Sequence, residues 1–359
     1  MNGLNNPIGY KSNQTLQQPF IMNPFRFGGG VVGGWKELDR TTLTGSGSSI
    51  DVTGLDNKQY LMVLRNILTS TADVRENFNS DTGNNYARRY MANGGGDNAS
   101  VNGTHIGLNY SAGDKFIVDY ISNLSSKEKL VISNSSEEGS AGAGNPPNRM
   151  EVVGKWANTS NAIDEVNTSL GGGSYDTGSE VVVLGWDASD THSDTDNFWQ
   201  ELASVDYDAS TPDELVTGTI PAKKYLFVQA YINGTAVGLQ DNTSFRFNGD
   251  TGNNYTFRNS NDGAADTTTI NYNYLRTLQS DTGNKSLSST FIVNNSSNEK
   301  LLISNAVKFT TAGGSTAPNR NDMAGKWTNT SSQITDIKYW QSGSGSFDTG
   351  STLKVWGHD

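Results

Sequence analysis

The chain has 359 residues, no cysteine and a formal net charge of −11, and it carries 40 glycines against 8 prolines. The missing cysteines exclude disulfides, thiolate metal sites and cysteine nucleophiles, and the acidic balance argues against sequence-independent nucleic-acid binding, which needs clustered Lys and Arg. No run approaches the roughly 18 consecutive apolar residues of a membrane span.

Residues 1–34 are predicted to form an extended N-terminal arm. They lack the basic start and the apolar stretch of a secretory signal, so we expect synthesis and folding in a cytoplasm. Glycines stand at 28–30 and 33–34, and isolated apolar residues lie near Pro19 and Pro24. This composition fits a disordered terminus or an arm that orders on a partner. Aromatic and Arg side chains dominate small interfaces, so the candidate anchor residues are Phe20, Phe25, Arg26 and Phe27.

Residues 35–187 and 199–359 are predicted to be two copies of one module. Eight blocks recur in the same order, and the spacing changes only between blocks, as loops allow. An Asp-rich linker, 188–198, separates the copies. The matched blocks include 58–63 with 223–228, 78–86 with 247–255, 116–118 with 291–293, 128–134 with 299–305, 154–156 with 325–327, and 175–179 with 347–351.

Within each copy the apolar residues alternate with a period of two, which is typical of strands. Residues 225–232 place one set of side chains on one face and an aromatic set on the other, so this strand is expected to be covered on both faces: Leu226, Val228, Ala230 and Ile232 against Tyr225, Phe227 and Tyr231. Seven to nine strands with long Gly-rich connections predict an all-β protein of two tandem jelly-roll-like β-sandwich domains. The best helix candidate is the short segment 161–167.

The Asp-Thr-Gly-Ser sequences at Asp176 and Asp348 resemble the paired motif of pepsin-like aspartic proteases. That family needs much of a lobe after each motif, and Asp348 lies close to the end of the sequence. Further Asp-Thr-Gly elements at Asp81, Asp250 and Asp281 indicate a recurrent turn, because Asp bonds its own turn and Gly supplies positive φ. We therefore predict no enzymatic activity.

No metal or cofactor site is predicted. His105, His192 and His358 share no ligand spacing, and the Asp-Asn loops around Asp81 and Asp250 lack a calcium-loop pattern, so they are interpreted as solvated turns.

The tryptophans divide into two groups. Trp35, Trp156, Trp199 and Trp327 recur at matched positions, which favours packing, although exposed aromatic rings on a sandwich could instead stack on sugars. Trp340 has no counterpart in the first copy, where Leu170 stands nearby, and it is the candidate for a surface contact particular to the second copy.

Blocks 247–255, 325–327, 334–337 and 350–357 resemble a β-module found in virion proteins of tailed bacteriophages. The resemblance covers about 35–359 and carries no catalytic motif. It implies a jelly-roll-like sandwich on the particle surface, in a tail appendage or fibre or in a capsid decoration.

The resemblance predicts a non-enzymatic virion structural protein, held to other virion proteins by its arm. It further predicts a homo-oligomer and a role in adhesion to a host-surface glycan. The alternative is a secreted carbohydrate-binding β-sandwich protein, in which Trp and Tyr form a stacking platform.

Overall fold

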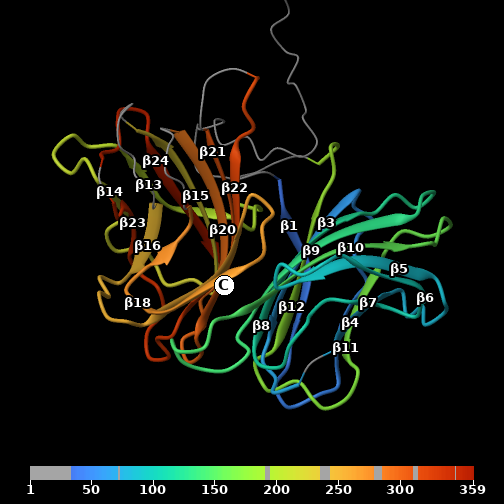
Figure 1. The fold of residues 1–359 in the computed structure, drawn as a ribbon. Helices are drawn as coiled ribbons and strands as arrows, with labels where there is room; N and C mark the ends of the chain where they lie inside the picture. Colours follow the sequence, from blue (N-terminus) through green and yellow to red (C-terminus); the bar gives the residue numbers. More distant parts are fainter. Residues whose placement is uncertain are drawn as a thin grey trace, which may run out of the picture.

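The computed structural model describes residues 34–71, 73–190, 195–234, 243–278, 285–309, 314–343 and 345–359. These residues form β-strands and connections, with no helix among them, and Figure 1 shows two β-rich bodies lying side by side. The prediction of an all-β, sandwich-type protein is confirmed. The candidate helix 161–167 is wrong: residues 161–164 have no regular structure, and Glu165 begins a strand that pairs on both sides.

The first half of the described chain supplies two sheets, which we call the first sandwich. The larger has the strand order β1-β12-β3-β8-β9-β10-β5-β6 and the smaller β2-β11-β4-β7. The bounds are β1 (Lys36–Thr42), β2 (Ser49–Thr53), β3 (Tyr60–Ile67), β4 (Val74–Phe78), β5 (Tyr86–Ala92), β6 (Asn98–Gly103), β7 (Ile106–Gly107), β8 (Lys115–Ser122), β9 (Lys129–Glu137), β10 (Asn148–Trp156), β11 (Glu165–Leu170) and β12 (Glu180–Trp186).

The second half supplies two further sheets, the second sandwich, in the same order with every strand number raised by twelve. The twelve described strands of each half exceed the seven to nine predicted, because short strands such as β7 and β19 carry little sequence signal. The bounds are β13 (Gln200–Asp206), β14 (Glu214–Val216), β15 (Tyr225–Asn233), β16 (Thr243–Phe247), β17 (Tyr255–Asn261), β18 (Thr267–Tyr272), β19 (Leu275–Arg276), β20 (Lys285–Val293), β21 (Lys300–Phe309), β22 (Asn319–Trp327), β23 (Ile337–Gln341) and β24 (Thr352–His358).

Strand register corrects one of the matched blocks. Tyr60 pairs with Ser122 in the first sandwich, and Tyr225 pairs with Val293 in the second. Residues 291–293 therefore correspond to 120–122 and not to 116–118. The error arose because Phe116-Ile117-Val118 is identical in sequence to Phe291-Ile292-Val293, although it lies four residues before the position that cross-strand pairing assigns.

Each sandwich has its own core between its two sheets. The predicted division of β15 is confirmed: Leu226, Val228, Ala230 and Ile232 belong to the core of the second sandwich, whereas Tyr225 and Phe227 face the other way. Successive side chains of a strand point to opposite faces of its sheet. The side chains on the outer face of β15 are therefore available for a second contact.

The outer faces of the two larger sheets meet in a buried apolar interface. Phe198, at the end of the Asp-rich segment, and the adjoining Trp199 are buried in it, so the last part of the predicted linker belongs to a core. Trp199 is packed against Phe227 and Phe291 with ring centroids 5.8 Å apart in each case. The buried members are Met62, Leu64, Phe116, Val118, Val182, Leu184, Phe198, Trp199, Tyr225, Phe227, Phe291, Val293, Leu301, Ile303 and Trp356.

Polar contacts complete this interface. Arg149 donates two hydrogen bonds to Asp266, at 2.9 and 2.8 Å, and the Tyr225 hydroxyl donates to Glu180 at 2.8 Å. Such pairing satisfies charged groups that the contact removes from water.

Candidate functional site

The Asp-Thr-Gly turns after β4 and β16 are structural. The carboxylate of Asp81 accepts hydrogen bonds from the backbone N–H of Gly83 at 2.8 Å and from the indole N–H of buried Trp156 at 2.7 Å. Asp250 accepts from Gly252 and Trp327 at 2.8 Å in each case. Both turns therefore fasten a loop to a core tryptophan.

The electrostatics of these turns follow from the same bonds. Partial desolvation would raise the pKa of Asp81, but donation from Trp156, Asn85 and Gly83 stabilises the carboxylate and leaves that pKa below its usual value. The pKa of Asp250 is lowered in the same way, against desolvation, by Trp327, Asn254 and Gly252.

The turns containing Asp176 and Asp348 hold the last strand of each sandwich. Ser179 bonds both backbone groups of Leu68, with its Oγ accepting from N–H at 2.9 Å and donating to the carbonyl at 3.0 Å. Ser351 bonds Asn233 in the same manner. Gly178 and Gly350 have φ of 91° and 95°, which Gly adopts at little cost. Among these described residues the motif is a turn, as its repetition predicts; Asp281 lies outside them.

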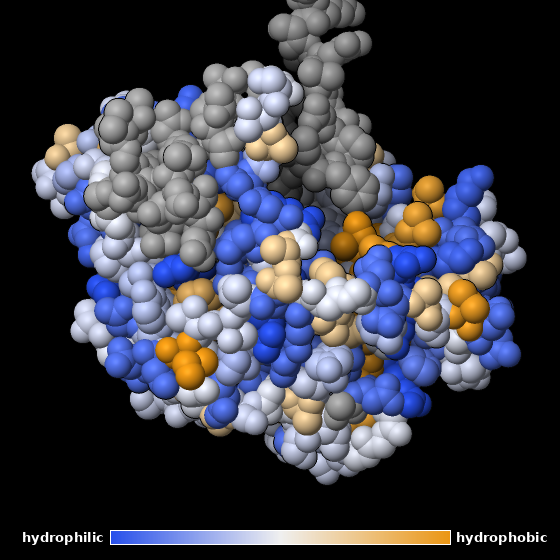
Figure 2. Space-filling view, in the orientation of Figure 1, coloured by the Kyte–Doolittle hydropathy of each residue, from blue (hydrophilic) through white to orange (hydrophobic). Residues whose placement is uncertain are grey.

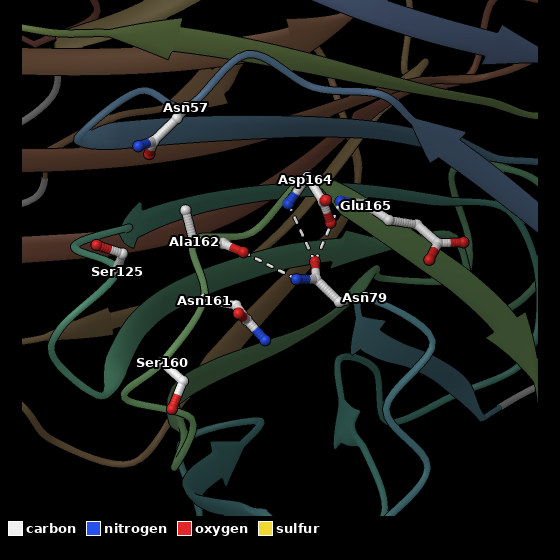
Figure 3. Close-up of a pocket in the computed structure, with 8 residues that line it drawn as sticks. All are labelled: Asn57, Asn79, Ser125, Ser160, Asn161, Ala162, Asp164 and Glu165. Atoms are coloured by element: carbon white, nitrogen blue, oxygen red, sulfur yellow. Dashed lines mark hydrogen bonds between the residues drawn. The ribbon is translucent and has the colours of Figure 1, made fainter.

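An open depression of about 630 Å³ lies on the first sandwich, and Figure 3 shows its lining. The Asn79 side chain makes three hydrogen bonds there: its Oδ1 accepts from the N–H groups of Asp164 and Glu165, and its Nδ2 donates to Ala162 O at 2.8 Å. Asn248 makes the corresponding three bonds in the second sandwich. These bonds engage both the oxygen and the nitrogen of the Asn79 side-chain amide. Asn79 therefore has a structural role in this depression, because it holds the loop of residues 162–165 in place.

The strongest candidate binding surface surrounds Trp340 on the smaller sheet of the second sandwich. The half-buried Trp340 ring lies 4.6 Å from the Arg246 guanidinium carbon and 5.7 Å from Lys338 Nζ. Tyr274 meets it edge-on with ring centroids 5.7 Å apart, and Tyr272 contacts Tyr274. We call Arg246, Tyr272, Tyr274, Arg276, Lys338 and Trp340 the aromatic-basic cluster.

The aromatic-basic cluster is particular to the second sandwich. Trp340 pairs with Ser244, and in the first sandwich the corresponding pair is Ser169 with Arg75. The predicted lack of a tryptophan counterpart is confirmed, with Ser169 as the aligned residue next to Leu170. By the same registers, the first sandwich has Asn77, Gly103, His105, Gly107 and Asn167 in place of Arg246, Tyr272, Tyr274, Arg276 and Lys338.

Several polar groups of the cluster retain bonding capacity. The Trp340 indole N–H and the Arg276 Nε are buried without a hydrogen-bond partner among the described residues. Lys338 forms an ion pair with Glu214, and Arg246 Nε donates to Asn273 O at 3.0 Å. The pKa of Tyr274 lies below its usual value: desolvation opposes this shift, but hydrogen bonds from Ser342, Tyr272 and Arg276 outweigh it.

Sequence reasoning singled out Trp340 but missed its neighbours. Arg246, Arg276 and Lys338 lie on three strands separated by long stretches of chain, so only the sheet brings them together. The signal that could have identified them is the difference between the copies, since each is basic where the first copy has Asn or Gly.

The other predicted residues are placed as follows. Trp156 and Trp327 are buried at corresponding core positions. Phe20, Phe25, Arg26, Phe27 and His192 lie outside the described residues. No group of three or more His, Cys, Asp or Glu able to hold a metal occurs within the described ranges, nor do these ranges hold a helix with the length and apolarity to cross a bilayer.

Comparison with known proteins identifies no family. No family model matches the chain, and no curated protein does. Among solved structures, Neisserial surface protein A aligns with a TM-score of 0.10 at 6% identity, covering 82% of this chain and 99% of its own. Human GIVD cytosolic phospholipase A2 gives 0.12 at 8%, covering 76% and 33%, and Pseudomonas aeruginosa OccK7 gives 0.07 at 7%, covering 79% and 99%. Likeness at these TM-scores carries no argument about fold or activity.

Proposed function

We propose that this protein is a non-enzymatic structural protein of a tailed-phage virion, displayed on the particle surface as a tail appendage or a capsid decoration. In this proposal residues 1–34 attach it to other virion proteins, and residues 35–187 and 199–359 are the displayed domains.

The observation that carries the proposal is the burial of two like-ordered sandwiches against each other. The apolar interface between the outer sheet faces holds the two sandwiches in a fixed relative orientation. A rigid pair of domains suits a structural protein better than two domains joined by a flexible linker. The module resemblance of the sequence supports the same assignment.

We further propose that each sandwich is a jelly roll. In a jelly roll, the chain crosses repeatedly between two four-stranded antiparallel sheets. The strand orders β1-β12-β3-β8 and β2-β11-β4-β7 match this topology. The strands β9, β10, β5 and β6 then extend the larger sheet beyond it.

The arm is tested by a variant that starts at Gly33. It is expected to remain soluble, to melt cooperatively, and to fail to join particles that lack the native protein. Substitution of Phe20, Phe25 and Phe27 by Ser in the full chain is the finer test, with Ser12→Ala as the matched control. Normal occupancy of the particle by the truncated protein would place the attachment in the sandwiches and overturn the arm assignment.

A glycan-binding role is the second candidate, and the aromatic-basic cluster favours it. Aromatic faces stack on the apolar side of sugars, and flanking Arg and Lys bond hydroxyls or acidic groups. Trp340→Ser and Lys338→Asn introduce the residues that the first sandwich has at these positions. The double variant should have an affinity for host-surface polysaccharide at least about tenfold lower than that of wild type. Ser169→Ala is the control. Unchanged binding would exclude this surface, and sugar binding by a protein absent from purified particles would favour the secreted carbohydrate-binding alternative.

A further inference from the structure

The larger sheet of the first sandwich has an apolar patch on its outer face. Leu130 and Ile132 of β9 and Val153 of β10 are 57%, 52% and 52% exposed. Ile132 is the cross-strand partner of Val153 on one side and of half-buried Tyr120 on the other. We call Leu130, Ile132 and Val153 the exposed patch. Figure 2 shows apolar side chains within a largely hydrophilic surface in the region where Figure 1 labels β5, β9 and β10.

The second sandwich has the same positions, but they are covered. The counterparts Leu301, Ile303 and Ala324 are 2%, 6% and 1% exposed. Leu301 and Ile303 belong to the interface between the sandwiches. One sandwich therefore already uses this part of its sheet to bind another sandwich.

Polar residues around the covered positions hold the first sandwich in place. Lys326 donates to Ser140 O at 2.7 Å, Glu299 accepts from Gly142 N–H at 2.7 Å, and Arg258 donates to Pro147 O at 2.9 Å. All three bonds reach one loop of the first sandwich.

The first sandwich repeats this polar frame around the exposed patch. Lys155, Glu128 and Arg89 occupy the positions of Lys326, Glu299 and Arg258. Lys155 and Glu128 bond each other at 2.8 Å, and Arg89 lies 3.7 Å from Asp97. The frame contains both charge signs, so two copies of it can place opposite charges together across a two-fold axis.

We propose that the exposed patch is the interface with a second copy of this chain, joined patch to patch about a two-fold axis. It is continuous with the interface inside the chain through Tyr120, which is packed against Phe291. The inference depends on the geometry of the two sheets and not on the virion assignment.

A second chain could instead dock head to tail, by repeating the contact that the first sandwich makes with the second sandwich. The residues of the second sandwich fit this arrangement less well. The surface by which the first sandwich covers the second includes Leu64, Val118 and Val182. Strand register puts Gln229, Ser289 and Lys354 at these positions in the second sandwich. Two polar groups and a charge replace the apolar contact, so a second chain is not expected to dock by that surface.

The test is the mass of the full chain in solution by light scattering and sedimentation. A monomer is 38.6 kDa, and we expect the doubled mass at micromolar protein. The variant Leu130→Ser/Ile132→Thr/Val153→Thr should be monomeric and still unfold in a cooperative melt, and Val101→Thr, exposed elsewhere, should remain dimeric. A monomeric wild type, or a triple variant that stays dimeric, overturns the proposal.

The contact geometry has a separate readout, because the native chain has no cysteine. Ile132→Cys should form an interchain disulfide on mild oxidation, whereas Val101→Cys should not. If the wild type is monomeric and becomes a dimer only after removal of residues 1–33, the arm covers the patch and the proposal is wrong.

Discussion

Arg65 is buried in the core of the first sandwich with two carboxylates. Its guanidinium contacts Glu76 and Asp119 and donates to Thr168 Oγ1 at 3.0 Å, and none of the three charged side chains is exposed. Glu76 Oε2 and Asp119 Oδ1 have no hydrogen-bond partner among the described residues. When Glu76 and Asp119 are both ionised, the cluster has one more negative than positive charge, in a place where unpaired charge is costly.

Strand register shows that the second sandwich dispenses with this cluster. Ala230, Phe245, Thr290 and Tyr339 stand at the positions of Arg65, Glu76, Asp119 and Thr168. The Tyr339 hydroxyl is within hydrogen-bonding distance of Thr277 and Ser288. One wiring is therefore compatible with either a charged or a mainly apolar centre.

We predict that Arg65→Ala destabilises the protein by about 3–5 kcal/mol, because it leaves buried carboxylates without a cation. Combining it with Glu76→Phe, Asp119→Thr and Thr168→Tyr, the residues of the second sandwich, should restore most of that loss. Urea unfolding followed by tryptophan fluorescence measures both. Equal stability of Arg65→Ala and wild type would contradict the proposed energetic role.

Glu76 should make stability depend on pH. Desolvation raises the pKa of Glu76, and attraction to Arg65 offsets only part of this shift. The native state therefore holds this proton more tightly than the unfolded state, and the contribution is present below the ordinary Glu range and lost as pH rises through the raised value. Gln does not ionise, so the Glu76→Gln variant should not lose this contribution as pH rises. The free energy of unfolding of the variant, relative to that of wild type, should therefore increase between pH 4.5 and pH 8. A constant difference would refute the shift.

At the scale of the element, the repeated Asp turn is the clearest structural device. Tyr86 and Tyr255 add to it, since each hydroxyl lies 3.0 Å from the N–H of the Phe that ends the preceding strand. A polar cap on a buried aromatic group explains why Asp, Gly, Asn and Tyr recur together in both halves.

We expect Asp81→Ala to cost about 1–3 kcal/mol, because it strands the buried indole N–H of Trp156. Thr82→Ala, in the same exposed turn, is the matched control and should be nearly neutral. Since the pKa of Asp81 is lowered, its contribution is present above the ordinary Asp range and disappears as pH falls through the lowered pKa. The Asp81→Ala deficit should therefore shrink on acidification, and thermal melts at pH 7 and pH 3 test this.

Much at this scale could be predicted from the sequence. The alternation in 225–232 gave the correct faces, and the recurrence of Asp-Thr-Gly gave the turns. The four-residue slip in β8 and the helix assigned to 161–167 show the limit: register and short strands depend on partners distant in the chain. The neighbours of Trp340 were missed for the same reason.

At the scale of the whole molecule, the two sandwiches are joined by an interface that the sequence only hinted at. The aromatic outer face of β15 predicted a second contact, but not that the first sandwich supplies it. The Asp-rich segment contributes too, because Phe198 N–H donates to Trp35 O at 2.8 Å and Asp196 pairs with Lys36. Both bonds hold the segment against the start of the first sandwich, beside the interface.

We predict that the full chain unfolds in one cooperative transition, because the buried interface couples the sandwiches. Leu64→Asp places an unpaired charge in that interface and should separate the melt into two transitions. Val101→Asp, at a position 70% exposed, is the control and should keep one. Calorimetry makes the comparison, and a single unshifted transition for Leu64→Asp would show that the contact adds little.

The unequal chemistry of the two contact faces also constrains how the gene can change. Two related stretches within one gene invite recombination, which copies one over the other or deletes one. If the second half replaced the first, the polar residue types of Gln229, Ser289 and Lys354 would stand at the positions of Leu64, Val118 and Val182. If the first half were deleted, Phe227 and Trp356 would be exposed to water. Selection against both products would keep the two halves different along these strands while leaving their shared turns free to stay alike.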